Sequence, residues 1–227
     1  AFVTRKDPRL FAIATQTPKA EQEGKAIDDF TAYDGGDPAV PYSLVNDKAT
    51  AGLCSKPTER YYKNATNEPM ILMGYTEQQL ILAEGVVRGW INGDDKTYYE
   101  SAVKASFEFY RTYATDVAAY LSEDAAETYL QGSEVVYDST LSTEQKIERI
   151  AMQKYLPTFL QGGVWLPYYE ALRTGYPDFR RASGVQLPYR WMYPQSEYNN
   201  NAANVQAALD SQFGGGDKTT DKPWWLQ

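Results

Sequence analysis

The chain has 227 residues, a formal net charge of −8 and a hydrophobic content of 43%. A chain of this length buries enough surface to fold without disulfides. Its acidic net charge argues against binding to nucleic acid and against membrane binding through a polybasic patch. It contains no histidine, which excludes Ser-His-Asp and Cys-His catalysis within the chain. The single cysteine, Cys54, excludes an internal disulfide and a cysteine-rich zinc site.

Aromatic residues are abundant: the chain holds 19 Tyr, 8 Phe and 5 Trp. Tyrosine combines an apolar ring with a polar tip, so it suits both packed helix seams and surfaces that stack on carbohydrate. The chain opens at Ala1 without an initiating Met or an apolar leader. We therefore expect a processed chain or a fragment.

Residues 1–70 are predicted to be rich in loops. Gly35-Gly36 and Asn46-Asp47 favour turns, and prolines recur at Pro8, Pro18, Pro38, Pro41, Pro57 and Pro69. A long irregular stretch is uncommon in a compact domain unless it is functional or packs onto a partner. We expect these loops to lie over a helical scaffold.

A first amphipathic helix is predicted over 76–91. Thr76 and Gln79 have the spacing of a capping box. The stripe recurs every three or four residues and comprises Thr76, Leu80, Ala83, Val87 and Trp90.

Two glycines share one flank of this predicted helix, Gly85 and Gly89. Each costs about 1 kcal/mol against alanine in a helix interior. We expect a second helix to approach closely there and to offset that cost. On the polar side, Glu84 and Arg88 form a favourable i,i+4 pair.

A second helix is predicted over 97–114, capped by Asp94 or Asp95. Its stripe comprises Tyr99, Ala102, Ser106, Phe109 and Tyr113. The short connection makes the two helices antiparallel neighbours. Together they span roughly 40 residues, close to a tetratricopeptide-type unit, although no second copy of the sequence is evident.

Further helices are predicted at 122–131, at 142–157 with a Ser142–Gln145 capping box, and at 163–175 with a stop at Gly175. The last two are expected to form a second antiparallel pair. From residue 176 the sequence becomes proline-rich and extended, followed by a final helix at 200–213. We predict a single domain over 1–227, with loops at 1–70, helix pairs at 71–175 and a tail at 176–227.

Catalytic chemistry has no clear candidate. A glycosidase needs two carboxylates around a sugar, but spacing and context single out none of Asp34, Asp37, Glu77, Glu84, Glu170 and Asp178. The Asp34–Asp37 stretch lacks the further oxygens of a calcium loop and is predicted to be a plain turn. We predict no enzyme activity, no metal and no cofactor.

Four tyrosines in the loop-rich segment are candidate ligand-binding residues: Tyr33, Tyr42, Tyr61 and Tyr62. Loops on a rigid scaffold often carry binding residues. A tyrosine face over a sugar ring, with Asn or Asp at the rim, would make a glycan site. The alternative is that these rings pin the loops to the helices.

Several stretches in order resemble the SusD/RagB family of outer-membrane nutrient-binding lipoproteins, in its SusD-like subgroup. The resemblance lies in "TRKDPRL", "EPMILMGYTEQQLILAEGVVRGW", "YYESAVKASFEFY", "QKYLPTFLQGGVWLPYYEALRTGYP" and "YRWMYPQSEYNNN". It covers most of 4–206 and corresponds to a C-terminal portion of the family. The chain departs from the family pattern at Pro157, Pro167 and Leu172.

The resemblance implies an all-α fold of tetratricopeptide-like antiparallel helix pairs with long irregular loops, an α-α superhelix. It implies a Bacteroidetes-type cell-surface protein that captures an oligosaccharide or polysaccharide without catalysis. In such a polysaccharide-utilisation system the ligand passes to a SusC-like TonB-dependent transporter. The lipid anchor at the outer membrane would lie in an N-terminal region that this chain does not contain.

Two alternatives remain open from the sequence. The first is an α-helical protein-interaction scaffold without sugar binding, whose aromatic seams contact a partner protein. The second is an all-α glycan hydrolase that uses two carboxylates.

Overall fold

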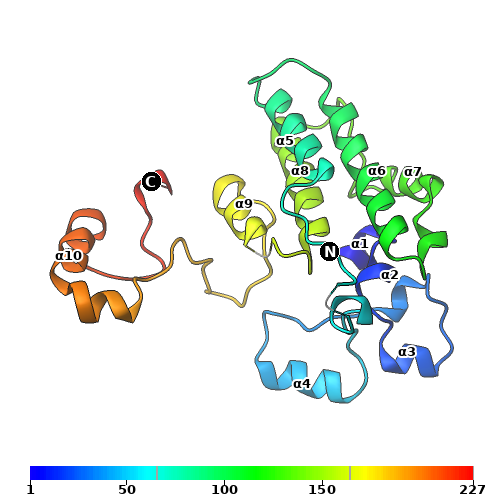
Figure 1. Cartoon of the computed structure of the whole chain (residues 1–227), viewed down its shortest axis with the longest axis horizontal. Coiled ribbons are helices and arrows are strands. Elements are labelled where there is room, and N and C mark those ends of the chain that lie inside the picture. The colour runs from blue at the N-terminus through cyan, green and yellow to red at the C-terminus, as the bar shows by residue number, and fades with distance from the viewer. Residues whose placement is uncertain (65, 164, 227) are drawn as a thin grey trace. The chain divides into compact units, whose positions relative to one another are not determined.

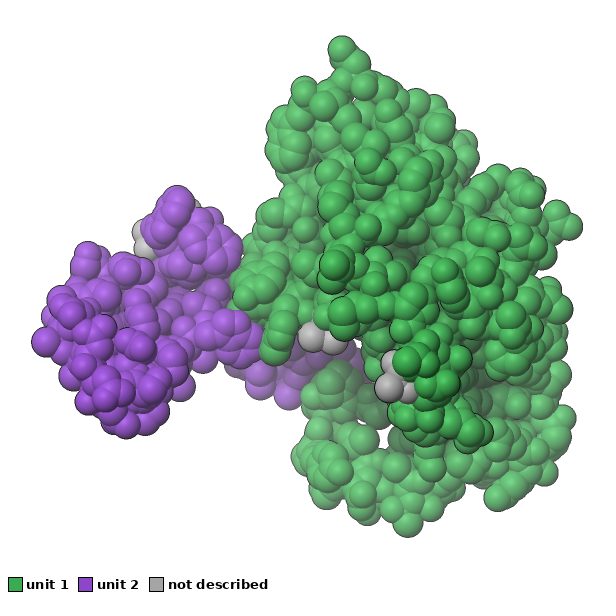
Figure 2. Space-filling view, in the orientation of Figure 1, with its two compact units in different colours: residues 1–179 green, residues 180–227 purple. Residues whose placement is uncertain are grey.

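The computed structural model describes residues 1–64, 66–163 and 165–226 (Figure 1). These residues form ten α-helices and four short 3₁₀ turns, and their only β-type pairing is an isolated bridge between Ala14 and Pro57. The all-α prediction is therefore confirmed. The chain divides into two compact units, Ala1–Phe179 and Arg180–Gln227 (Figure 2). The single-domain assignment stays a prediction.

The first seventy residues contain short helices where the sequence predicts only loops. They are α1 (Phe2–Arg5), α2 (Leu10–Ile13), α3 (Pro18–Gln22) and α4 (Tyr42–Thr50), with 3₁₀ turns η1 (Phe30–Ala32) and η2 (Glu59–Tyr61). At the start of α3 the side chain of Thr17 accepts from the backbone N–H of Ala20, with Pro18 in the first turn. Helices this short are marginal alone and depend on tertiary packing.

Helix α2 is the buried anchor of this segment. All four of its residues are buried, and Arg9, which precedes it, is 1% exposed. The Arg9 guanidinium forms an ion pair with Asp7 at 2.7 Å and donates to Ser106 Oγ at 2.8 Å. It also donates to Gln153 Oε1 at 3.0 Å. The "DPRL" motif therefore ties the N-terminal segment to the helices that follow.

Helices α5 (Tyr75–Val87) and α6 (Asp95–Tyr113) form the predicted antiparallel pair (Figure 1). Asp94 caps α6 by accepting from the backbone N–H of Lys96, as predicted. The facing stripes are buried at Leu80 and Tyr99. Each stripe ends at an exposed side chain, Trp90 after α5 and Tyr113 on α6, so the pair leaves the C-terminal end of each stripe open.

Two local predictions for α5 are wrong. The helix begins after Gly74 with no side-chain cap, so Thr76 lies inside its first turn. Gly89 adopts a left-handed φ of 71° just past the helix end. The N–H groups of Trp90 and Gly89 donate back to the carbonyls of Gly85 and Val86, both at 2.9 Å. This is a Schellman stop.

Gly85 serves the same stop rather than a contact between helices. A Cβ there would lie 3.3 Å from the side chain of Ile91, which folds back from the loop. Among the described residues, no atom of a second helix lies within 4 Å of that Cβ position. The two glycines therefore end the helix and turn the chain.

The remaining helices of this unit are α7 (Glu123–Leu130), α8 (Thr143–Thr158) and α9 (Leu166–Thr174), with η3 (Ala118–Leu121) between α6 and α7. The predicted capping box of Ser142 and Gln145 is present on α8. Helix α8 packs against α5 and α9. Pro157 lies inside the last turn of α8. Pro167 lies in the first turn of α9, where a missing backbone N–H is tolerated.

The second unit holds α10 (Gln195–Phe213) and the 3₁₀ turn η4 (Trp224–Leu226). Helix α10 is interrupted by non-helical torsion angles at Asn201 and ends at Gly214 in the left-handed conformation. Asp217 holds the preceding segment against this helix: it pairs with Arg190 at 2.6 Å and accepts from the hydroxyl of Tyr198 at 2.5 Å.

Candidate functional site

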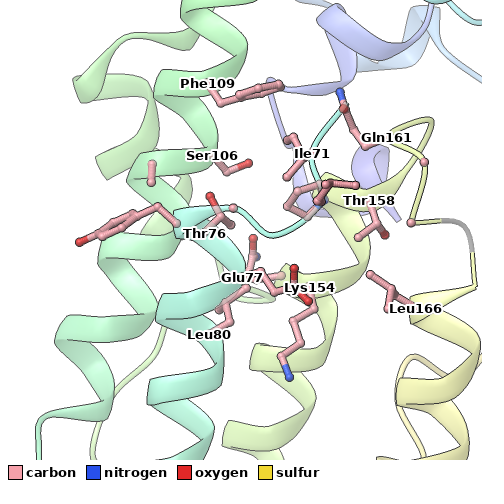
Figure 3. A pocket seen from close by; sticks show the side chains of 18 of the residues that line it. Ile71, Thr76, Glu77, Leu80, Ser106, Phe109, Lys154, Thr158, Gln161 and Leu166 are labelled. Carbon is pink, nitrogen blue, oxygen red and sulfur yellow. The ribbon is translucent and has the colours of Figure 1, made fainter. Parts of the chain in front are cut away.

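A pocket of about 780 Å³ lies in the first unit between α5, α6, α8 and the start of α9 (Figure 3). Leu80 of α5, Phe109 of α6 and Thr158 of α8 contribute to its wall, and the loop that carries Ile71 runs beside it. Leu166 of α9 lies on a further side. Apolar side chains dominate this lining because the amphipathic helices meet here with their apolar faces.

Five charged side chains tie α5, α8 and α9 together beside this pocket. We call them the Glu84 network: Glu84, Arg88, Lys154, Glu170 and Arg173. Glu84 is buried and accepts from Arg88 at 2.7 Å, Lys154 at 3.0 Å and Arg173 at 2.7 Å. Glu170 accepts from Lys154 at 3.2 Å and from Arg173 at 2.7 Å.

The network keeps Glu84 ionised. Burial by itself would raise the pKa of the Glu84 carboxyl, but hydrogen bonds from Arg173 and Arg88 and the charge of Lys154 outweigh it and lower the pKa to about 2. A general acid needs the opposite shift, towards neutral pH. The pairing of Glu84 with Arg88 was predicted. Its burial and its partners on α8 and α9 were not, because they come from 70 and 89 residues away.

A second polar cluster lies beside the pocket and includes Gln161 of its lining. Arg60 of η2 pairs with Glu68, with 2.8 Å between Nε and the carboxylate, and Gln161 donates to the same carboxylate. The Arg60 guanidinium lies 5.7 Å from the centre of the Tyr110 ring. Arg60 Nη1 and Gln161 Oε1 are buried without a hydrogen-bond partner among the described residues. Buried polar atoms of this kind call for a partner.

Tyr33 is buried and acts in packing. Its ring lies 5.6 Å from that of Phe11, and its hydroxyl donates to the carbonyl of Ile27 at 2.7 Å. Its face is therefore covered by the protein's own side chains.

The other three predicted tyrosines lie on two different elements. Tyr42 begins α4 and is 82% exposed, and Tyr62 follows η2 and is 66% exposed. Tyr61 is half-buried in η2, with the Arg60 guanidinium 5.4 Å from its ring centre. None of the four lines the pocket, so a glycan site at these rings stays a prediction.

The acidic turn at 34–37 is used for local structure. Asp34 forms an ion pair with Lys48 at 2.6 Å, and its carboxylate accepts from the backbone N–H of Gly35. Over the described parts of the chain, no three side chains of His, Cys, Asp or Glu gather where a metal ion could bind. In the same residues no helix combines the length and the apolar character that a bilayer crossing needs.

The fold and the pocket define a class: an all-helical protein of paired amphipathic helices with polar, aromatic loops. Residues 1–194 match the family model for SusD-like proteins, described as "Starch-binding associating with outer membrane". The chain therefore belongs to the SusD-like family. No curated protein matches the sequence.

Solved structures agree with this assignment. A candidate outer membrane protein from Bacteroides vulgatus ATCC 8482, linked to nutrient binding, is 76% identical and superposes with a TM-score of 0.96. A SusD homologue from Bacteroides fragilis NCTC 9343 is 52% identical with a TM-score of 0.91. A chitin-binding SusD homologue from Flavobacterium johnsoniae is 22% identical with a TM-score of 0.70, which supports the fold.

Each comparison covers the whole of this chain but only part of the other, namely 50%, 50% and 48% respectively. The chain thus spans about half the length of these structures and matches their C-terminal half. The SusD-like family consists of non-catalytic binding proteins for nutrients at the outer membrane. The predicted family, fold class and non-enzymatic character are confirmed.

Proposed function

We propose that this chain is part of a cell-surface glycan-binding subunit that captures oligosaccharides and delivers them to a TonB-dependent transporter. The observation that carries the proposal is the match of residues 1–194 to a starch-binding, outer-membrane family. The protein would be held at the membrane by a lipid anchor outside these 227 residues, and its transporter would be of the SusC type.

The glycan contact is proposed at the exposed rings of Tyr42 and Tyr62. An exposed aromatic face stacks on the apolar face of a sugar ring, and nearby carboxylates and amides bind its hydroxyls. Asp34 and Lys48 lie on the same loop-and-helix segment as Tyr42. Tyr33 and Tyr61 support this region by holding their loops in place.

The proposal is tested by affinity electrophoresis of the purified chain in gels that contain starch, soluble chitin derivatives or other polysaccharides. We expect the mobility of the chain to fall in at least one gel while a non-binding control protein migrates unchanged. Unchanged mobility across the whole panel would refute glycan capture by this chain.

A further inference from the structure

The second compact unit carries exposed tryptophans beside a small pocket of its own. The pocket has a volume of about 280 Å³ and lies between the segment 190–194, the end of α10 and Pro223. Trp191 is 51% exposed and contributes to the lining, and Trp224, which follows Pro223, is 79% exposed. We call this pocket the tryptophan pocket. Large exposed apolar side chains that gather on one surface mark a site that binds another molecule.

An ion pair holds the polar side of the tryptophan pocket in place. Arg190 pairs with Asp217 at 2.6 Å, and its guanidinium lies 4.3 Å from the centre of the Phe213 ring. Asp217 also accepts from the backbone N–H of Tyr193 at 3.0 Å. Because these contacts fix the wall of the pocket before a ligand arrives, binding costs little further ordering of side chains.

The lining combines apolar and polar groups, and this mixture selects the class of ligand. Trp191 and Met192 offer apolar surface, and the exposed Gln212 amide can both donate and accept hydrogen bonds. The charge of Arg190 is balanced by Asp217, so the pocket does not favour an anion. A neutral sugar fits both properties, because its C–H face stacks on an indole ring and its hydroxyls need hydrogen-bond partners.

The size of the tryptophan pocket favours a single sugar unit over a protein surface. Pockets for drug-sized ligands measure roughly 300–1,000 Å³, so a volume of about 280 Å³ suits a smaller group, such as one hexose unit of a longer chain. A stable protein interface covers roughly 800 Å² on each partner, which is far more than the few side chains around this pocket provide.

We propose that the tryptophan pocket is a second glycan contact, which binds one neutral sugar unit of a longer chain through Trp191 and Gln212. The proposal rests on the proposed glycan capture. It adds a contact in the second unit to the one at Tyr42 and Tyr62 in the first. Each contact binds sugar by itself, and a polysaccharide that engages both gains affinity from each.

The test follows each tryptophan separately. The chain is labelled with 5-fluorotryptophan, so that its five tryptophans give five fluorine NMR signals, which single tryptophan-to-phenylalanine variants assign. It is titrated with an oligosaccharide of every polysaccharide in the electrophoresis panel. We expect the Trp191 signal to shift and saturate with at least one of them, also in the Tyr42→Ala/Tyr62→Ala chain. The signal of Trp90, which is 70% exposed on the first unit, should not shift.

Two variants test the same contact in the polysaccharide gels. Trp191→Ala and Gln212→Ala should each raise the dissociation constant for the retarding polysaccharide at least threefold. Their circular dichroism and melting curves should be unchanged, because both side chains are exposed. The matched control Trp90→Ala should migrate as the wild type does. Wild-type retardation of both pocket variants would overturn the second contact.

The two readouts separate this contact from glycan capture as a whole. A Trp191 signal that no oligosaccharide shifts, in a chain that the gels retard, would overturn the second contact and leave glycan capture standing. A chain that no gel retards and whose signals no oligosaccharide shifts would overturn both. A Trp191 signal that shifts on dilution of the chain alone would assign the pocket to a second copy and overturn the proposal as well.

Discussion

Arg9 joins segments that lie far apart in the chain. Its partners Ser106 and Gln153 are 97 and 144 residues away, and its guanidinium lies 5.0 Å from the centre of the Phe107 ring. No pattern in the neighbouring sequence predicts that Arg9 is buried or that its partners are so distant. The sequence predicts a loop at "DPRL", because the residues that bury Arg9 belong to later helices.

Arg9→Met should destabilise the protein by about 3–5 kcal/mol, because Asp7 would remain buried without its partner. The free energy of unfolding is measured by urea titration with circular dichroism. Arg111→Met is the control: Arg111 is half-exposed and pairs with Glu108 on the surface, where such pairs contribute about 0–1 kcal/mol. A loss for Arg9→Met no larger than for Arg111→Met would contradict the anchoring role.

Tyr42→Ala and Tyr62→Ala should each weaken glycan binding about tenfold, equivalent to roughly 1.4 kcal/mol. The melting temperatures of both variants should equal that of the wild type, because both rings are largely exposed. Tyr169→Ala on α9, also exposed, should bind as the wild type does. Calorimetric titration with the glycan that retards the chain makes the comparison. Wild-type affinity in both loop variants would contradict a glycan site at Tyr42 and Tyr62.

At the scale of the helices, most short-range signals were confirmed, although the capping box predicted at Thr76 and Gln79 does not form. The capping box of Ser142 and Gln145 and the cap at Asp94 form as predicted, because their chemistry lies within one turn. The glycine stop at Gly175 also forms. The role of Gly85 was misjudged, since a glycine on a helix flank fits both a helix contact and a helix stop. The Ile91 side chain beside Gly85 and the left-handed torsion of Gly89 decide between them.

The Glu84 network gives the packing of α5, α8 and α9 a pH dependence. The pKa of Glu84 is about 2 in the folded chain and 4.5 ordinarily. Because the folded pKa is depressed, the network stabilises the protein above pH 4.5, and this contribution is lost as pH falls from about 4.5 towards 2.

Glu84→Gln should therefore lower stability at pH 7 and flatten its decline below pH 4.5. The difference between wild type and variant should shrink by on the order of 3 kcal/mol between pH 6 and pH 2. Urea unfolding at a series of pH values measures it. A difference that stays constant over this range would show that the carboxylate charge does not support the packing.

For the whole molecule, the sequence predicted the helical class and the family, but not the short helices of residues 1–70. Helices of four or five residues, such as α1, α2 and α3, are too short for periodicity to reveal and form only against the rest of the fold. The pocket also escaped prediction, because its wall combines α5, α6, α8 and α9. None of the predicted site tyrosines contributes to it.

Capture of a glycan without chemical change is tested by calorimetry followed by chromatography of the same sample. The chain is titrated with an oligosaccharide of the polysaccharide that retards it, and the sugar is analysed after prolonged incubation. We expect saturable binding heat and an oligosaccharide that is recovered intact. Shortened products that disappear in a carboxylate variant, or an absence of binding for every glycan tried, would contradict it.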